Sequence, residues 1–213
     1  MATDVPVARH LRAAALAAIA AVAVLSASAV SARPSDKQGS QLRVAELARG
    51  LEAPWSVAFL PDGRALITER PGRLRLLRAG GLAAVPVATL RVGAQGEAGL
   101  LGIALDPGYP KRSFAYLYYT APGGANRVSR FRLVSAGAAG LRLTNEKVLL
   151  DGIPGAGIHD GGRIAFGPDG KLYVPVGAPC NICEPDPAHY ALIGSLNPDG
   201  SGYKIVARGV RNS

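Results

Sequence analysis

Short apolar runs separated by turn residues recur along this chain from about residue 43 to its end. The stretch Ile158–Gly177 shows the pattern most clearly, with one strand-like run at Arg163–Phe166 and another at Leu172–Val176. Asp169-Gly170 stands between these runs, and Asp-Gly in that position is a strong hairpin signal. Long amphipathic helical runs are absent after residue 33, and glycine and proline interrupt the sequence at strand-length intervals. The pattern predicts an all-β fold.

One unit, an apolar strand ending in proline, then a turn and a second strand, occurs three times. The copies are Ser56–Pro61 with Ala65–Thr68, Gly102–Pro107 with Phe114–Thr120, and Arg163–Pro168 with Leu172–Val176. Their prolines, Pro61, Pro107 and Pro168, are 46 and 61 residues apart, which is the scale of a propeller blade.

Further strands are expected after the first two copies. Third strands are predicted at Arg73–Leu77 and Val128–Val134, and fourth strands at Ala83–Leu90 and Lys147–Leu150. Four strands in each unit are typical of a blade, so the fold predicted is a β-propeller with about three blades in this chain. A β-sandwich is the alternative, but it does not explain why each copy repeats the same order of proline, turn and strand.

Three blades do not close a ring, because an open end leaves strand edges and apolar faces bare. The last residues, Gly209–Ser213, stand where the inner strand of another blade would begin. We therefore expect the sequence to be a C-terminally truncated piece of a longer propeller. The alternative is a small β domain that pairs with a second copy.

The N-terminus predicts export. Arg9 and Arg12 precede an alanine-rich apolar run, and Val30-Ser31-Ala32 fits a signal-peptidase site. The predicted organisation is a signal peptide at 1–32, a linker at 33–42 and a partial propeller at 43–213. An uncleaved membrane anchor is the alternative for the first segment, although its alanine content makes it a weak membrane span.

The composition makes the chain basic. The whole chain carries +9 at pH 7, and +8 remains once residues 1–32 are removed. Arginines are scattered on alternating positions of strand-like runs, without basic blocks or interleaved aromatic residues, which argues for solvated strand faces and against a nucleic-acid surface. A basic surface does favour anionic substrates, cofactors or cell-envelope polymers.

Two cysteines, Cys180 and Cys183, form a C-x-x-C pair. Glu184 follows in place of histidine, so covalent haem attachment is excluded. There is no second C-x-x-C to complete a closed zinc site. In an exported chain the pair reads as a disulfide that pins one loop, with a redox role as the alternative.

His159 is the residue with the clearest chemical potential. It precedes a strand and stands beside Gly161 and Gly162, where a ligand could approach the backbone closely. An imidazole has an unperturbed pKa of about 6.5, so it can accept a proton near neutral pH. His159 is therefore a candidate general base, and a histidine that merely caps the strand is the structural alternative.

Four segments together resemble the soluble PQQ-dependent sugar dehydrogenases, the group that contains glucose, aldose sugar and sorbosone dehydrogenase-like proteins. The segments are LEAPWSVAFLPDGRALITERPGRLRLL (51–77), GEAGLLGIALDPGY (96–109), HDGGRIAFGPDGKLYVPVG (159–177) and ARGVRNS (207–213). GAPCNICEPD and the later LNPDGSG are most similar to the sorbosone dehydrogenase-like branch.

The resemblance implies a six-bladed propeller that binds pyrroloquinoline quinone (PQQ) and Ca²⁺ near its central channel. It implies that His159 takes the proton of the sugar hydroxyl while hydride passes to the quinone. Glu97 matches a family residue that reaches the substrate, with Gln95 as a weaker candidate, and Arg211 and Asn212 match a pair that contacts the quinone. A guanidinium suits the carboxylates of PQQ. The family's calcium ligands come from later blades, so no metal ligand is assigned here.

Two departures leave the substrate open. Ile158 stands where glucose dehydrogenase has an aspartate, and Ala178 follows Gly177 where several relatives have Gly-Asp. The resemblance further implies a periplasmic or secreted enzyme with a periplasmic electron acceptor, and this chain alone is expected to have little activity.

Two other functions remain open at this point. One is a non-enzymatic propeller that binds a protein or a glycan through its loops, since a fold does not fix a function. The other is a calcium-dependent lactonase, which would need clustered acidic ligands. Candidates for those ligands are Glu97, Asp160, Glu184 and Asp186.

Overall fold

Three antiparallel β-sheets account for the fold in this computed structural model, which describes residues 42–213. One structural unit runs from Val44 to Ser213. The predicted signal peptide and almost all of the predicted linker lie outside the described residues. Within residues 42–213 no helix has the length and apolar character needed to cross a bilayer. The predicted all-β fold is confirmed, with a single 3-10 turn at Gly137–Ala139 in the described part.

The first sheet has the strand order β1-β2-β3-β4, and β5 also pairs with β3. Its strands are β1 (Pro54–Phe59), β2 (Ala65–Glu69), β3 (Arg73–Arg78), β4 (Gly81–Leu82) and β5 (Ala88–Thr89). The outer strand predicted at 83–90 is wrong in extent, because two short strands flank an irregular segment there. Pro86 lies in that segment and has no N–H with which to continue a ladder.

The second and third sheets each have four strands in sequence order. The second contains β6 (Leu100–Leu105), β7 (Phe114–Thr120), β8 (Asn126–Ser135) and β9 (Leu141–Ile153). The third contains β10 (Ala165–Phe166), β11 (Leu172–Val176), β12 (Leu192–Leu196) and β13 (Lys204–Arg208). The structure thus adds two strands, β12 and β13, that the sequence pattern did not predict.

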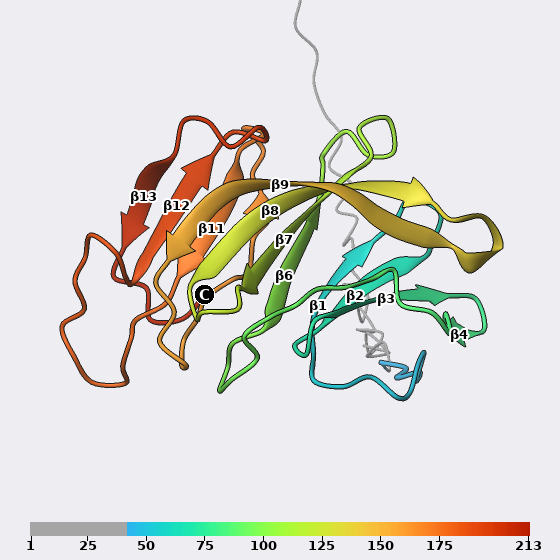
Figure 1. Cartoon of the computed structure of the whole chain (residues 1–213), viewed down its shortest axis with the longest axis horizontal. Helices are drawn as coiled ribbons and strands as arrows, with labels where there is room; N and C mark the ends of the chain where they lie inside the picture. The colour runs from blue at the N-terminus through green and yellow to red at the C-terminus, as the bar shows by residue number, and fades with distance from the viewer. Residues whose placement is uncertain (1–41) are drawn as a thin grey trace, which may run out of the picture. The chain divides into compact units, whose positions relative to one another are not determined.

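The middle sheet is buried on both faces, and β7 shows why its sequence reads as a continuous apolar run. Successive side chains of a strand point to opposite faces. Ala115, Leu117 and Tyr119 pack into a core shared with the first sheet. Tyr116 and Tyr118 pack into a second core shared with the third sheet. The three sheets therefore stand side by side, each face of the middle one covered by a neighbour (Figure 1).

The first strands of neighbouring sheets lie next to each other. Strand β6 contacts both β1 and β10. The Thr68 hydroxyl on β2 donates to the Leu101 carbonyl on β6 (2.6 Å), and the Leu100 N–H donates to the Arg70 carbonyl (2.9 Å). Sheets ordered from an inner first strand to an outer fourth strand, packed face to face, are blades. The chain therefore forms three blades of a β-propeller.

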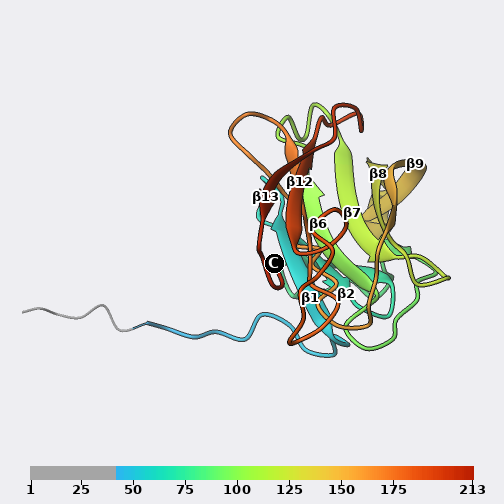
Figure 2. The ribbon, with the colours of Figure 1, turned by 90° about the vertical axis from the view of Figure 1, so that its left-hand side faces the viewer.

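Blade topology brings certain loops to one end of the strands. In an antiparallel sheet, the segment entering the first strand and the loop joining the second to the third lie at the same end. These segments are 90–99, 121–125, 154–164 and 177–191, joined by the residues after β13. Figure 2 views the molecule from the side of the third blade, with β12 and β13 toward the viewer. The sequence-predicted site residues all lie at this end.

Candidate active site

His159 lies at the centre of this end, in the segment that leads into β10. Its backbone has φ of 55°, in the left-handed region, where a residue with a Cβ costs about 1–2 kcal/mol. Its carbonyl oxygen packs so tightly against Gly177 that a Cβ on that glycine would overlap it, at 1.7 Å. Strained non-glycine residues held by their surroundings cluster at functional sites. The fold thus holds His159 in an unfavourable conformation that the predicted role as a base would explain.

The imidazole is positioned by a backbone carbonyl. Nδ1 of His159 lies 3.2 Å from the carbonyl oxygen of Ala178, in the loop between β11 and β12. The residue is 6% exposed, so its ring is largely enclosed by the described residues. A carbonyl only accepts hydrogen bonds, and Nδ1 must therefore carry the proton that it donates. In the neutral ring, Nε2 is then the nitrogen with a free lone pair.

Glu97 is brought to His159 across 62 residues of sequence. Its Oε2 accepts the backbone N–H of His159 at 2.6 Å, while its own N–H donates to the carbonyl of Gly157 at 3.0 Å. Glu97 is exposed, and its Oε1 accepts no hydrogen bond from the described residues. The segments carrying the two residues are thus tied together, with one carboxylate oxygen left for a ligand.

Gln95 and Asp160 line a cavity of about 360 Å³ beside these residues. Most of its remaining wall is glycine, which leaves backbone groups uncovered; the full lining is Gly93, Gln95, Ala98, Thr120, Gly123, Gly124, Gly155, Gly157 and Asp160. Its size falls within the range of small-molecule sites. His159 is not among the lining residues, so this cavity adjoins the candidate base and does not contain it.

Asp160 is a buried carboxylate with incomplete hydrogen bonding. It is 4% exposed, and its Oδ1 accepts from the Asn126 amide at 3.0 Å. Its Oδ2 is buried without a partner among the described residues. The Tyr118 hydroxyl donates to the Asp160 backbone carbonyl at 2.8 Å, and burial together with the charge of Asp160 raises the pKa of Tyr118 well above its usual value. Tyr118 is therefore a neutral donor that holds this segment.

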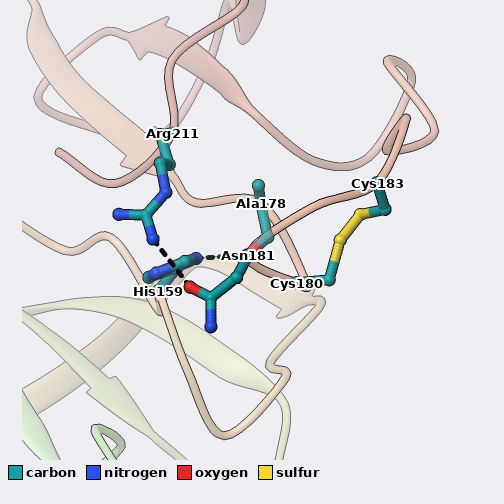
Figure 3. Close-up of a disulfide and its surroundings, with 6 residues drawn as sticks. All are labelled: His159, Ala178, Cys180, Asn181, Cys183 and Arg211. Atoms are coloured by element: carbon teal, nitrogen blue, oxygen red, sulfur yellow. Dashed lines mark hydrogen bonds between the residues drawn. A yellow bond between two sulfur atoms is a disulfide. The ribbon is translucent and has the colours of Figure 1, made fainter.

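Arg211 and Asn212 also reach the segment around His159. The carbonyl of Arg211 accepts the N–H of Ala178 at 2.7 Å, and its guanidinium donates to the Asn181 side chain at 2.6 Å. Figure 3 shows Arg211, Asn181 and the His159 ring close together. The Oδ1 of Asn212 accepts the N–H of Gly161 at 3.2 Å. Both residues thus contact the loops that hold the candidate base.

Cys180 and Cys183 form a disulfide in the same loop, with Cα atoms 6.0 Å apart. Both cysteines, with Asn181 and Arg211, line a second cavity of about 230 Å³. The bridge closes a short loop that begins two residues after Ala178, the residue whose carbonyl contacts His159 (Figure 3). Among the described residues, no three His, Cys, Asp or Glu side chains are grouped to hold a metal ion.

Three contributors to this arrangement, Ala178, Tyr118 and Asn181, are missing from the sequence-based list of candidate residues. Ala178 acts through its backbone, so its side chain carries no signal. Tyr118 could have been noticed only by asking what holds the segment of His159 in place, and Asp160 was considered only as a candidate calcium ligand. Asn181 stands inside the C-x-x-C pair, and that position was the available signal.

Comparisons with known proteins agree with this architecture. The Glucose / Sorbosone dehydrogenase family model matches residues 51–201, more than half of the chain. The Escherichia coli aldose sugar dehydrogenase YliI is 32% identical over 136 residues, covering 60% of this chain and 36% of that protein. The uncharacterized protein slr1608 of Synechocystis is 36% identical over 149 residues, covering 64% of this chain and 35% of that protein.

A solved structure is similar as well. The PQQ-bound aldose sugar dehydrogenase of Streptomyces coelicolor superposes with a TM-score of 0.70 at 31% identity, covering 79% of this chain and 54% of that one. The chain thus spans about a third of these curated relatives and about half of this solved structure. The family model, the relatives and the three packed blades show that the chain belongs to the glucose/sorbosone dehydrogenase family.

Proposed function

We propose that this chain carries the base of a PQQ-dependent dehydrogenase that oxidises an aldose or a related sugar aldehyde. Membership of the family and the names of the E. coli and S. coelicolor relatives support sugar oxidation in general. The finer proposal is that His159 removes the hydroxyl proton of the sugar. It rests on the position of the imidazole.

The contact between His159 and Ala178 carries this proposal. Because Nδ1 donates to the carbonyl of Ala178, the ring is held in the tautomer whose Nε2 accepts a proton. The same hydrogen bond remains when Nε2 becomes protonated, since both nitrogens of imidazolium are donors. The carbonyl dipole also stabilises the positive charge that develops on the ring. A general base needs this combination of fixed orientation and free lone pair.

Glu97 and Gln95 are the proposed substrate contacts. Oε2 of Glu97 is engaged by the His159 N–H, so Oε1 is the atom that would accept a hydrogen bond from a sugar hydroxyl. Gln95 lines the adjoining cavity and has both a donor and an acceptor in its amide. The hydrogen bond between Glu97 and His159 would place the sugar-binding oxygen and the base in one rigid unit.

The residues present fit PQQ through their donors. Arg211 is exposed, and its carbonyl binds the N–H of Ala178, whose own carbonyl contacts His159. A guanidinium fork suits the carboxylates of this cofactor. Asn212 engages its Oδ1 with Gly161, which leaves its amide N–H groups as donors. When bound, the quinone would accept the hydride from the sugar carbon as His159 takes the hydroxyl proton. Ca²⁺ is part of the proposal through the family resemblance, with no ligand assigned.

The predicted signal peptide places this reaction in the periplasm or outside the cell, with a periplasmic electron acceptor as partner. After removal of the signal we propose neither a membrane nor a nucleic-acid partner. The E. coli relative whose structure is known is described as a soluble aldose sugar dehydrogenase. Export also suits the Cys180–Cys183 disulfide, which persists in an oxidising compartment.

A His159→Gln variant of the full-length gene product tests the base. With PQQ, Ca²⁺ and a panel of aldoses, dye reduction should fall by about 10²–10⁴-fold, the usual contribution of a general base. His189→Gln is the matched control, because His189 is exposed and its ring contacts Asp186 and none of the candidate site residues. An H159Q enzyme as active as the parent would refute the proposed role.

Cofactor binding separates this enzyme from a non-enzymatic propeller. PQQ should raise the melting temperature of the parent and of H159Q alike, because a ligand that binds the native state stabilises it by mass action. A propeller that only binds a protein or glycan would show no such shift. If PQQ raised the melting temperature of the parent but the parent oxidised no sugar, the proposed substrate would be wrong and the proposed cofactor would stand.

A further inference from the structure

The segment 177–191 between β11 and β12, which carries the Cys180–Cys183 disulfide, is connected to His159 by a circuit of hydrogen bonds. Ala178 occupies its centre, since its carbonyl accepts from Nδ1 of His159 (3.2 Å) and its N–H donates to the Arg211 carbonyl (2.7 Å). Three residues further on, the Asn181 side chain accepts from the Arg211 guanidinium at 2.6 Å. Arg211 is thus held at its backbone by Ala178 and at its side chain by Asn181.

We propose that Asn181 is a positioning residue for the base, and that the disulfide holds it in place so that the Ala178 carbonyl stays against Nδ1 of His159. This inference rests on the proposed function of His159, because it explains how that imidazole is kept in the productive tautomer. Figure 3 shows the disulfide, Asn181, Arg211 and the His159 ring gathered around Ala178.

The segment 177–191 has few other contacts that could hold Ala178 in place. Residues 177–191 connect β11 to β12, and most of residues 181–189 are exposed. Ile182, between the cysteines, is 98% exposed, so the loop gains little hydrophobic anchoring there. Ladder hydrogen bonds end at Val176 and resume at Leu192. The disulfide and the Asn181–Arg211 contact are therefore cross-links where packing is sparse.

Loss of the disulfide or of the Asn181–Arg211 contact should change the tautomer of His159 while the fold is kept. If the Ala178 carbonyl moves away, nothing in the described contacts of His159 keeps the proton on Nδ1, and Nε2 becomes free to carry it. A ring protonated on Nε2 donates where the base must accept. A displacement of about 1 Å at a catalytic group can cost on the order of 10²-fold in rate, so the effect on turnover would be large.

Long-range ¹H–¹⁵N NMR of the histidine rings in the full chain tests this directly, without cofactor or substrate. The parent should show His159 as the Nδ1–H tautomer, with its signals assigned through H159Q. Asn181→Ala should lose much of the Nδ1–H population, and Cys180→Ser/Cys183→Ser should do the same. Asn181→Asp keeps an oxygen acceptor for Arg211 and should restore the parent spectrum.

Ile182→Ala is the matched control within the loop, and His189 supplies an internal reference signal, since neither residue contacts His159. I182A should leave the His159 signals unchanged, and the His189 signals should be the same in I182A as in the parent. If the cysteine double variant does not fold, the N181A and N181D pair still decides the matter. Parent-like His159 tautomers in N181A would overturn the proposal. Failure of His159 as a catalytic base would show instead in dye reduction by H159Q, so the two ideas fail separately.

Discussion

Two buried carboxylates in this protein have opposite surroundings. Glu69, at the end of β2 in the first blade, is 0% exposed. Its Oε1 accepts the N–H of Glu52 at 2.6 Å, and its Oε2 accepts from Arg73 at 2.6 Å and from Arg75 at 3.4 Å. Both oxygens are therefore satisfied, and the buried charge is paired with two guanidinium groups.

Asp160, beside the candidate base, has no such pairing. Its Oδ1 accepts a single amide hydrogen bond from Asn126, and its Oδ2 has no partner among the described residues. No arginine or lysine of the described chain forms an ion pair with it. A buried carboxylate left this way is costly unless something outside the chain satisfies it.

The difference separates a structural carboxylate, Glu69, from a carboxylate beside the candidate site, Asp160. At Glu69 burial alone would raise the pKa, but hydrogen bonds from Arg73 and from the Glu52 N–H outweigh burial and lower it. The sequence-based view that these arginines lie on solvated faces is wrong for Arg73 and Arg75, which partly cover Glu69. Their contacts stabilise the blade. Asp160 lines a cavity, and its unsatisfied buried oxygen lowers the stability of the folded state.

Glu69→Gln should cause the largest loss of stability. The new amide would point a donor at Arg73 and leave Arg75 without its ion-pair partner, while Arg73 keeps only its exposed pair with Glu52. This should cost about 2–4 kcal/mol of unfolding free energy. Asp151→Asn is the control, because its ion pair with Arg127 is exposed and should contribute less than about 1 kcal/mol. Urea unfolding measures both. Equal losses of unfolding free energy in the two variants would mean that the buried ion pairs of Glu69 contribute no more than an exposed one.

Asp160→Asn, unlike E69Q, should not lower the free energy of unfolding. The amide keeps an acceptor for Asn126 and removes an unpaired buried charge, so the unfolding free energy should stay the same or rise by about 1 kcal/mol. The same urea titration measures it beside E69Q. A loss as large as that of E69Q would show that Asp160 has a structural partner after all, and the contrast between the two carboxylates would fail.

Much of the fold could be predicted from the sequence. Phe114–Thr120 and Leu172–Val176 coincide with β7 and β11, because a strand buried on one or both faces leaves an apolar run bounded by turn residues. Strand β12 was missed because Gly194 and Ser195 interrupt its apolar run. The Tyr203 ring lies against Gly194, where a Cβ would meet it at 2.4 Å. That packing requires glycine but is invisible in a hydrophobic pattern.

The candidate site was predictable only in part. The resemblance pointed to Glu97, His159, Arg211 and Asn212, and the structure places these residues at one end of the blades. Their actual connections run through backbone groups, such as the Ala178 carbonyl and the His159 and Gly161 N–H groups. Every residue type has these groups, so no sequence motif could reveal which one orients the imidazole.

Acid should reduce the difference in unfolding free energy between the parent and E69Q. The pKa of Glu69 is lowered from its ordinary value of 4.5, so its stabilising contribution is complete above that pH and is lost as pH falls through the lower folded-state pKa. E69Q lacks a titrating group at this position. The difference in unfolding free energy should therefore be constant from pH 7 to about 5 and shrink below pH 4.5. Urea titrations at several pH values measure it. A difference that grows in acid would mean that burial outweighs the Arg73 and Glu52 hydrogen bonds and favours the protonated form of Glu69.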